Sequence, residues 1–217
     1  MTHDRQATRD YYGALFDWAF DETGRAALQE RAVAGVGAPD DASTTAPPHW
    51  LSFVSVEDAD TTVQKAEGLG AQILASPVDV GTSGRMAMLR DPLGVNLALW
   101  EPQQSHGAQL VNQHGSLCWN ELLTHDAVAA GSFYTTLFDW TIEPYGDIYT
   151  VFMNGDRPGG GLLTLDEADG GPSTWLVYFM VDDCDAVHDR SNSLGGRVQM
   201  PPDDWPEIGR GAVLIDP

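Results

Sequence analysis

The chain repeats itself, and the repeat limits the folds open to it. Leu-Phe-Asp-Trp occurs at Leu15–Trp18 and again, 122 residues later, at Leu137–Trp140. Two longer blocks recur 125 residues apart: HWLSFVSVEDAD (49–60) matches TWLVYFMVDDCD (174–185), and GRMAMLRDP (84–92) matches GRGAVLIDP (209–217). So long a period indicates two copies of a domain and not a solenoid. The 217 residues therefore predict two domains of about a hundred residues each, at 1–103 and 104–217.

The charge of the chain disfavours some partners. Thirty-two acidic and eleven basic side chains give a net charge of −21, a field that repels phosphate backbones and anionic membrane surfaces. We therefore expect neither nucleic acid nor a membrane as a partner. The polar N-terminus lacks the apolar segment of a secretory signal, which predicts a cytoplasmic location. Two cysteines, Cys118 and Cys184, provide neither a disulfide framework nor a metal spacing.

Strand and helix signals alternate in each half, most clearly in the second. Aspartates that can cap helices precede two helical patterns, at Asp126 and at Asp183 or Asp185. The helices are expected to end near Trp140 and at Gly195-Gly196. β-Branched and aromatic runs predict strands at 116–124, 148–153, 159–165, 175–181, 197–200 and 209–215. Each half is thus predicted to contain two units, each with a strand, a helix and further strands.

The two ends of the chain break this pattern. The first half starts directly in a helix, predicted over 7–18, and the second half stops at Asp216-Pro217. In the first half the equivalent Asp91-Pro92 continues into a strand at 95–100, and a polar linker is predicted at 101–115. One strand is therefore expected to be absent at each end. A sheet that lacks a strand exposes an unpaired edge, which predicts a homodimer formed through such edges.

These blocks resemble the vicinal oxygen chelate superfamily, which includes glyoxalase I, bleomycin-resistance proteins and extradiol dioxygenases. The resemblance rests on SFYTTLFDW and DYYGALFDW at the helix ends and on GRMAMLRDPLGVNLALWEP before a final strand. It is greatest for a tandem-domain actinobacterial branch described as glyoxalase-like proteins or hydroxylases. The family implies an α+β fold of two tandem domains, built from paired βαβββ units whose curved sheets form a cup. Equivalent residues of the halves, Trp18 with Trp140, Trp50 with Trp175 and Arg85 with Arg210, should then superpose.

Metal-dependent members of this superfamily carry His, Gln or Glu where the first strand of a unit starts and Glu within the last strand. Transferred one at a time, the testable positions fall on Leu51, Ala98, Trp119 and Leu176. None of these side chains can ligate a metal, and their sequence neighbours do not supply a ligand set. The remaining positions fall in the strands expected to be absent. We therefore expect neither a metal nor another cofactor.

Strand alternation predicts which side chains line the cup if Trp119 faces it. The predicted lining is mostly apolar and aromatic, which is typical of a small-molecule site. An alternative interpretation is that these side chains simply fill the space between packed units. The candidate ligand-binding residues are Leu51, Phe53, Asn96, Ala98, Trp100, Trp119, Leu123, Leu176, Tyr178 and Met180.

Glu121 is the candidate catalytic residue on the same predicted face. A carboxyl group in apolar surroundings can act as a general acid or base, or can instead accept a hydrogen bond from Tyr178. Three functions stay open: a metal-independent cup for a small hydrophobic or aromatic molecule; a glyoxalase-, hydroxylase- or dioxygenase-type enzyme that uses Glu121 or residues of the absent strands; and a non-catalytic structural module.

Overall fold

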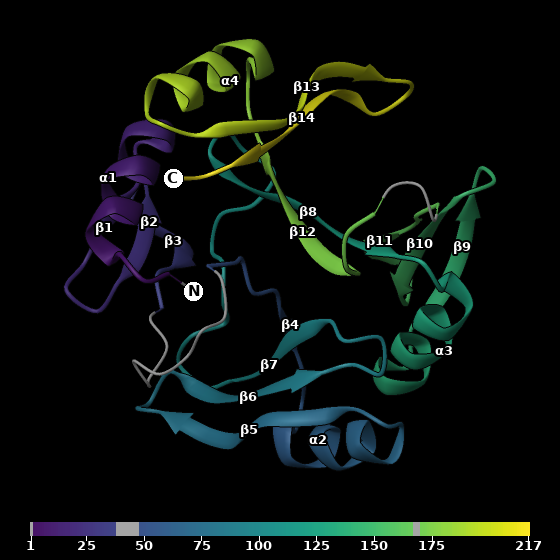
Figure 1. Ribbon diagram of the computed structural model, residues 1–217. Coiled ribbons are helices and arrows are strands. Elements are labelled where there is room, and N and C mark those ends of the chain that lie inside the picture. Colours follow the sequence, from purple (N-terminus) through teal and green to yellow (C-terminus); the bar gives the residue numbers. More distant parts are fainter. Residues whose placement is uncertain (1, 38–47, 167–169) are drawn as a thin grey trace. The chain divides into compact units, whose positions relative to one another are not determined.

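The computed structural model describes residues 2–37, 48–166 and 170–217. These ranges form an α+β fold, as expected (Figure 1). None of the helices within them is long and apolar enough to cross a membrane. The elements are α1 (Arg5–Phe16), β1 (Ala19–Phe20), β2 (Arg25–Leu28), β3 (Arg31–Gly35), β4 (Phe53–Ser55), α2 (Ala59–Gly68), β5 (Gln72–Val80), β6 (Gly84–Arg90), β7 (Asn96–Pro102), β8 (Ser116–Thr124), α3 (Ala127–Phe138), β9 (Thr141–Tyr145), β10 (Tyr149–Asn154), β11 (Arg157–Thr164), β12 (Thr174–Met180), α4 (Cys184–Ser193), β13 (Arg197–Trp205) and β14 (Gly209–Ile215).

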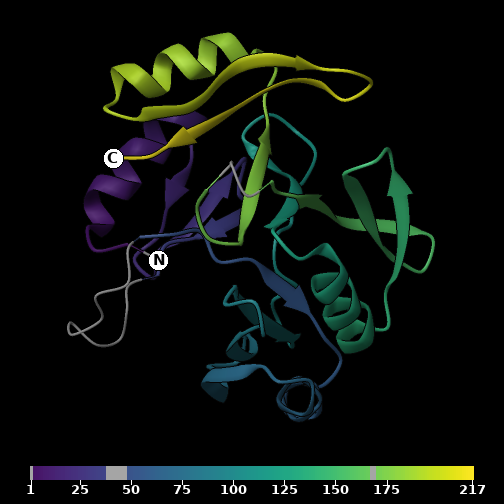
Figure 2. The same ribbon diagram turned by 45° about the vertical axis from the view of Figure 1, so that its right-hand side comes forward.

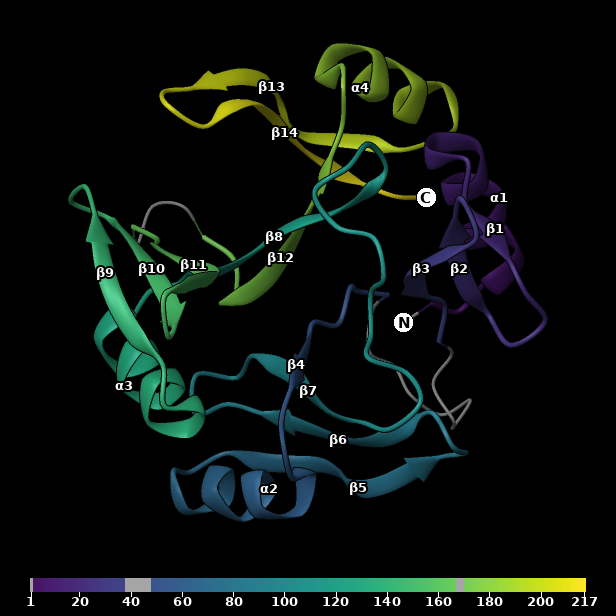
Figure 3. The ribbon, with the colours of Figure 1, turned by 180° about the vertical axis from the view of Figure 1, so that it is seen from behind.

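Two stretches of the chain form complete βαβββ units. In the first, the strand order is β4-β7-β6-β5, with β4 and β7 parallel. In the second, the order β8-β11-β10-β9 repeats this topology, and β12 lies on the other side of β8. Helix α2 packs against β5 and β6 (Figure 2), and α3 packs against β9 and β11 (Figure 3). Elsewhere in the described ranges, β1-β2-β3 form a three-stranded sheet and β13-β14 a two-stranded one.

The described residues group into two compact units, each combining segments from both halves of the sequence. The terminal unit contains Met1–His49, Ala108–Cys118 and Phe179–Pro217, and the central unit contains Trp50–Gly107 and Trp119–Tyr178. This grouping differs from the division at 103/104 that the repeat predicts for the two tandem domains, which stays a prediction.

All four helices named above begin at an aspartate, because its side chain accepts a hydrogen bond from a backbone N–H of the first turn. The caps are Asp4, Asp58, Asp126 and Asp183, so Asp183 and not Asp185 caps α4. Helices α1 and α3 end at the aspartate of the repeated Leu-Phe-Asp-Trp, and this residue, Asp17 or Asp139, adopts the left-handed conformation. The helices therefore stop two residues before the predicted ends at Trp18 and Trp140.

A buried hydrogen-bond chain lies within the core of the central unit. The hydroxyl of Tyr134 donates to Asp91 (2.8 Å) and accepts from the indole of Trp175 (3.1 Å). Asp91 also accepts from the backbone N–H groups of Leu93 and Val95, so this buried carboxylate is fully engaged. Apolar side chains surround these hydrogen-bonded residues. They include Leu89, Leu97, Leu99, Leu122, Phe152 and Leu162.

Aromatic rings dominate the core of the terminal unit. Tyr12 stacks on Trp18, and Phe179 packs against both Trp18 and Phe16. The hydroxyl of Tyr12 donates to Asp216 at 3.0 Å. Tyr12 and Asp216 are the repeat equivalents of Tyr134 and Asp91, so both units contain the same tyrosine–aspartate contact.

Several elements differ from the predicted ones. Strands β1, β2, β3 and β9 were not predicted, and β13 continues to Trp205 and not only to residue 200. The predicted linker at 101–115 begins within β7, and its Leu110 is buried. Trp175 is a buried residue of β12, whereas Trp50 precedes β4, so the expected equivalence of these two tryptophans is not met at the level of the strand. Trp18 and Trp140, in contrast, both follow the left-handed aspartate.

Candidate ligand site on the β8 sheet

The sheet that contains β8 has one face towards the core and one away from it. Leu122, Phe152 and Leu162 lie on the core side with α3. Alternation places the neighbouring residues on the opposite face. The register there aligns Glu121 with Gly161, Gly161 with Val151, and Val151 with Glu143. We call this the Glu121 face; it comprises Trp119, Glu121, Leu123, Glu143, Tyr149, Val151, Gly161, Leu163, Leu176 and Tyr178.

Glu121 is buried on this face and accepts a hydrogen bond from a tyrosine. The hydroxyl of Tyr178 donates to Glu121 Oε2 at 2.8 Å, as the sequence suggested as an alternative to catalysis. The negative charge of Glu121 also acts on the Tyr149 hydroxyl and raises its pKa. Trp119 Nε1 in turn donates to the Tyr149 hydroxyl at 2.8 Å. The two hydrogen-bonded pairs lie on one face, and three of the four side chains were among the residues predicted from the sequence.

Tyr149 acts as a donor because its proton is held firmly. Burial, and then the negative charge of Glu121, raise the pKa of Tyr149 well above its usual value, while the hydrogen bond from Trp119 acts in the opposite direction. The phenol therefore stays protonated at neutral pH and can donate a hydrogen bond.

Gly161 makes room for this group. A Cβ atom at Gly161 would collide with the Tyr149 hydroxyl and would lie 2.9 Å from Trp119 Nε1. The three successive glycines Gly159–Gly161 lie in β11, whose pairing with β10 shifts register between Phe152 and Met153, as in a bulged strand.

The second sheet of the central unit carries another set of predicted residues. Its core side includes Val54, Leu89 and Leu99. Cross-strand pairs on the opposite face form rows, and none of the described side chains in these rows is a carboxylate. We call this the Arg90 face; its rows are Gln72–Arg90–Asn96, Ala75–Met88–Ala98–Phe53 and Val78–Met86–Trp100–Ser55.

The predicted lining residues therefore lie on two different sheet faces. Trp119, Glu121, Leu123, Leu176 and Tyr178 lie on the Glu121 face, whereas Phe53, Asn96, Ala98 and Trp100 lie on the Arg90 face. Leu51 precedes β4, and Met180 is an exposed residue at the end of β12 in the terminal unit. Tyr149, Gly161 and Arg90 were not among the residues predicted from the sequence. Alternation within the predicted strand 148–153 would have pointed to Tyr149 had the cup side of that strand been assigned.

The donor groups present do not fit a metal ion. Within the described ranges, no group of three or more His, Cys, Asp or Glu side chains is arranged to hold one. Glu121 is engaged by Tyr178, and the aligned Glu143 is separated from it by two intervening strands.

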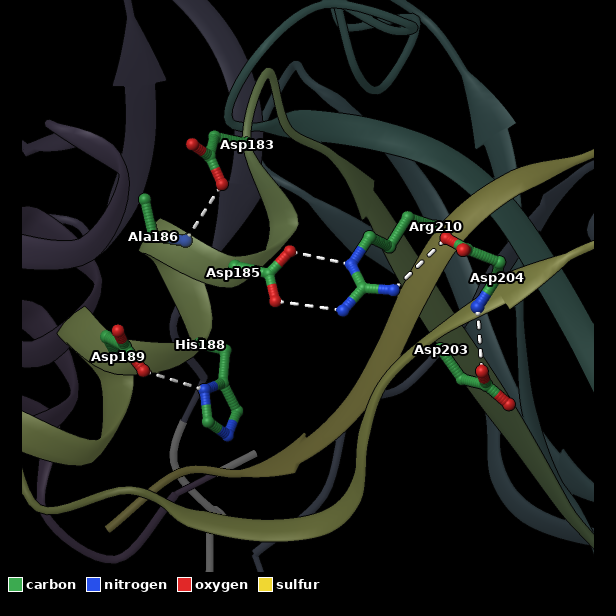
Figure 4. Close-up of polar contacts among 8 residues, drawn as sticks. All are labelled: Asp183, Asp185, Ala186, His188, Asp189, Asp203, Asp204 and Arg210. Carbon is green, nitrogen blue, oxygen red and sulfur yellow. Dashed lines mark hydrogen bonds and ion pairs between the residues drawn. The ribbon is translucent and has the colours of Figure 1, made fainter.

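A cluster of acidic and basic side chains in the terminal unit, shown in Figure 4, forms ion pairs within that unit. Arg210 on β14 pairs with Asp185 on α4 and with Asp204 on β13. Its repeat equivalent, Arg85, pairs with Asp60 and Asp79 in the central unit. His188 pairs with its neighbour Asp189. Because these aspartates pair with basic side chains of the same unit, we assign the group to structure.

Known proteins resemble this chain along its whole length. The glyoxalase/bleomycin resistance protein/dioxygenase superfamily model matches residues 1–99. "Putative glyoxylase CFP32" of Mycobacterium tuberculosis is 36% identical over 231 aligned positions, covering 100% of this chain and 88% of that protein. "Anthracycline biosynthesis protein DnrV" of Streptomyces peucetius is 35% identical, covering 79% of this chain and 63% of that protein.

Solved structures share the fold at low sequence identity. The Mn(II)-bound glyoxalase from Novosphingobium aromaticivorans aligns with a TM-score of 0.61 and 13% identity, covering 99% of this chain and 75% of that chain. The 2,3-dioxygenase LapB from Pseudomonas sp. KL28 aligns with a TM-score of 0.54 and 13% identity, covering 99% of this chain and 90% of that chain. At such identities the likeness concerns the fold alone.

Proposed function

Because the chain belongs to the glyoxalase/bleomycin resistance protein/dioxygenase superfamily, we propose that it binds a small hydrophobic or aromatic molecule on the Glu121 face without a metal ion. One observation carries the proposal. A buried carboxylate, Glu121, receives a hydrogen bond from Tyr178 on a face that is otherwise mostly apolar and aromatic. Apolar walls with a few convergent polar groups are the usual composition of a small-molecule site.

The Glu121 carboxylate favours a ligand that donates a hydrogen bond. A carboxylate accepts only, and Tyr178 occupies part of its capacity. A ligand hydroxyl, amine or amide N–H could use the remaining lone pairs, while Trp119 and Leu123 contact its apolar body. The net charge of −21 also disfavours an anionic ligand here.

The names of the relatives support a planar aromatic probe. One relative is named for anthracycline biosynthesis, and anthracyclines are fused aromatic ring systems that carry hydroxyl groups. We therefore choose an anthracycline as the first ligand to test. Its hydroxyl groups match the acceptor at Glu121, and its rings match Trp119.

The second candidate function is that of an enzyme, and the protonated state of Tyr149 favours it. Since Tyr149 keeps its proton, Glu121 is an acceptor that could remove a proton from a bound ligand. The glyoxylase name of the mycobacterial relative agrees with such chemistry. One variant distinguishes simple binding from proton transfer. Glu121→Gln would retain most of the binding of a hydrogen-bonding ligand but would abolish turnover.

Binding is measured by the quenching of tryptophan fluorescence on addition of the anthracycline, with isothermal titration as a second readout. Trp119→Phe and Tyr178→Phe should each weaken binding several-fold, because one removes an aromatic wall and the other releases Glu121. Glu143→Gln is the matched control for Glu121→Gln, because it removes the same charge from the exposed edge strand β9 of the same sheet.

Two results would count against the proposal. Equal affinity in Trp119→Phe, Tyr178→Phe and Glu143→Gln would place the ligand elsewhere. Affinity that disappears on dialysis against a chelator and returns with one equivalent of a divalent metal would overturn metal independence. If neither the anthracycline nor smaller phenols bind, the structural-module hypothesis replaces both candidates.

A further inference from the structure

Strand β14 of the terminal unit has one paired edge and one unpaired edge. Within the described ranges it pairs only with β13, whereas its repeat equivalent in the central unit, β6, pairs with β5 on one edge and with β7 on the other. The second edge of β14 therefore presents backbone N–H and C=O groups to which a further strand can bind.

The side chains of β14 are also less buried than those of β6. Leu89 on β6 is fully buried, and its equivalent Leu214 is half-buried. The same difference separates Ala87 from Ala212. On β7, the register partners of Ala87 and Leu89 are two buried leucines. An added strand with apolar residues at these two positions would cover Ala212 and Leu214 and would gain hydrophobic burial.

The glycine at the start of each strand shows what else β7 contributes. A Cβ atom at Gly84 would collide with the ring of Trp100 on β7. The equivalent Gly209 is exposed, and among the described residues a Cβ atom there would meet nothing within 4 Å. An aromatic residue of an added strand would therefore find room at Gly209.

Helix α4 also lacks a hydrogen bond that α2 receives from β7. The backbone N–H of Ala59, the first residue of α2, donates to Glu101 on β7 at 2.9 Å. Within the described parts of the chain, the equivalent N–H of Cys184 in α4 has no acceptor. An aspartate precedes and follows this residue in both helices, so the neighbouring charges do not prevent the contact. The register that pairs Glu101 with Arg85 would also place a carboxylate beside Arg210.

We propose that the unpaired edge of β14 is a docking site for an extended segment of a partner protein. The segment runs antiparallel to β14 and carries two apolar residues at alternate positions, followed by an aromatic and then an acidic residue. Its apolar residues cover Leu214 and Ala212, its ring packs at Gly209, and its carboxylate accepts from the N–H of Cys184. In such strand addition the main-chain hydrogen bonds provide affinity and the side chains provide specificity.

A second copy of this chain is the competing occupant. Its own β14, with the sequence Gly-Arg-Gly-Ala-Val-Leu-Ile, supplies neither the aromatic nor the acidic residue. The docking site therefore favours a different polypeptide. It is independent of the small-molecule site proposed on the Glu121 face.

The probe is a fluorescently labelled peptide with the sequence of residues 95–102, VNLALWEP, and binding is measured by fluorescence anisotropy. Wild-type protein should bind it, and a scrambled peptide of the same composition should not bind. Glu101→Gln in the peptide should weaken binding about threefold or more, because a charge-assisted hydrogen bond is lost. Trp100→Ala in the peptide should weaken it at least as much.

Two protein variants test the contact with α4. Cys184→Pro removes the N–H at a helix position that tolerates proline, and the extended backbone of the preceding Asp183 suits it. This variant should weaken binding of the original peptide as much as Glu101→Gln does, with no further loss when the two changes are combined. Cys184→Ala retains the N–H and is the matched control, with affinity close to that of the wild type.

Amide hydrogen exchange locates the bound peptide. Exchange should slow at residues 209–215, while residues 84–90, which are already paired on both edges, should not change. The proposal is overturned if the scrambled peptide binds equally well, if protection appears away from β14, or if no binding occurs at millimolar peptide. A dimer of the peptide-free protein in which 209–215 are already protected would also overturn it, because a second copy would then occupy the edge.

Discussion

The central and terminal units contain the same tyrosine–aspartate contact, and in each unit its two residues come from different halves of the sequence. In the central unit, Tyr134 from the second half donates to Asp91 from the first. In the terminal unit, Tyr12 from the first half donates to Asp216 from the second. The contact recurs, but its surroundings differ. Tyr134 is fully buried and also accepts from Trp175, whereas the bond of Tyr12 is only partly buried. Repeated sequence blocks therefore specify the same contact without specifying how deeply it is buried.

A neighbouring contact is a polar pair in the terminal unit and an apolar pair in the central unit. In the terminal unit, Tyr11 and Ser191 share a buried hydrogen bond of 2.7 Å between α1 and α4. Their repeat equivalents in the central unit, Phe133 and Ala66, are both apolar members of the core. Removing both hydroxyl groups together avoids leaving either one buried without a partner, which is the costly outcome.

The largest expected difference between the units concerns core leucines. Leu89 is fully buried on β6, between β5 and β7, while its repeat equivalent Leu214 on β14 is half-buried. We expect Leu89→Ala to lower the free energy of unfolding by about 3 kcal/mol, through lost burial and a cavity. Leu214→Ala should cost about 1 kcal/mol because less apolar surface is involved. Urea unfolding followed by circular dichroism measures both; equal costs would show that the two cores are packed alike.

The shared tyrosine provides the next comparison. Tyr134→Phe removes a hydrogen bond to the buried Asp91 carboxylate and the acceptor of the Trp175 indole, so we expect a loss of about 2–3 kcal/mol. Tyr12→Phe removes one partly buried bond to Asp216 and should cost about 1 kcal/mol. Both changes leave the ring in place, so packing is a common background. A larger cost for Tyr12→Phe than for Tyr134→Phe would contradict the inferred role of burial.

The Tyr11–Ser191 pair can be tested against its apolar counterpart with a double-mutant cycle. Tyr11→Phe or Ser191→Ala alone should each cost about 1–2 kcal/mol, because the remaining hydroxyl loses its buried partner. The double variant, which recreates the Phe–Ala combination of the central unit, should be nearly as stable as the wild type. Additive costs in the double variant would mean that the two hydroxyl groups act independently.

The sequence predicted the parts of the molecule in which side-chain pattern and local geometry coincide. Asp126 caps α3 as expected, and SLCWNELLT forms β8 over its predicted span. Strand alternation correctly placed Glu121 and Tyr178 on one face. In contrast, β9 (TIEPY) is exposed throughout and contains a proline, so no apolar alternation marked it. The partners of Glu121 and Arg90 depend on cross-strand register, which is a tertiary property that one chain's pattern does not reveal.

Alkaline pH should also affect the units differently. Burial, and then the charge of Asp91, raise the pKa of Tyr134 well above its usual value; burial also raises the pKa of Tyr11. A pKa raised in the folded state means that the stability contribution is complete below the unfolded value of about 10 and is lost as the pH rises towards the folded value. Stability should therefore fall above about pH 10. Urea midpoints at pH 9 and pH 10.5 should show a flatter dependence in Tyr134→Phe, and a smaller flattening in Tyr11→Phe.

The smallest effect is expected where the two units are most alike. Arg85 bridges Asp60 and Asp79, and Arg210 bridges Asp185 and Asp204, at the same sequence spacing. These hydrogen bonds raise the pKa of both arginines, so each stays charged at every accessible pH. Since the ion pairs are exposed, water and salt screen them, and Arg85→Gln and Arg210→Gln should each lower the thermal midpoint less than any change above.

Both shifts should shrink further in 1 M NaCl, where the Debye length is about 3 Å. A midpoint shift in Arg85→Gln that is large and independent of salt would show that this arginine contributes through packing of its stem against α2 and β5. A large, salt-independent midpoint shift in Arg210→Gln alone would show that the two arginines contribute differently to stability. The two units would then differ at a contact where the sequences, the partners and the spacing agree.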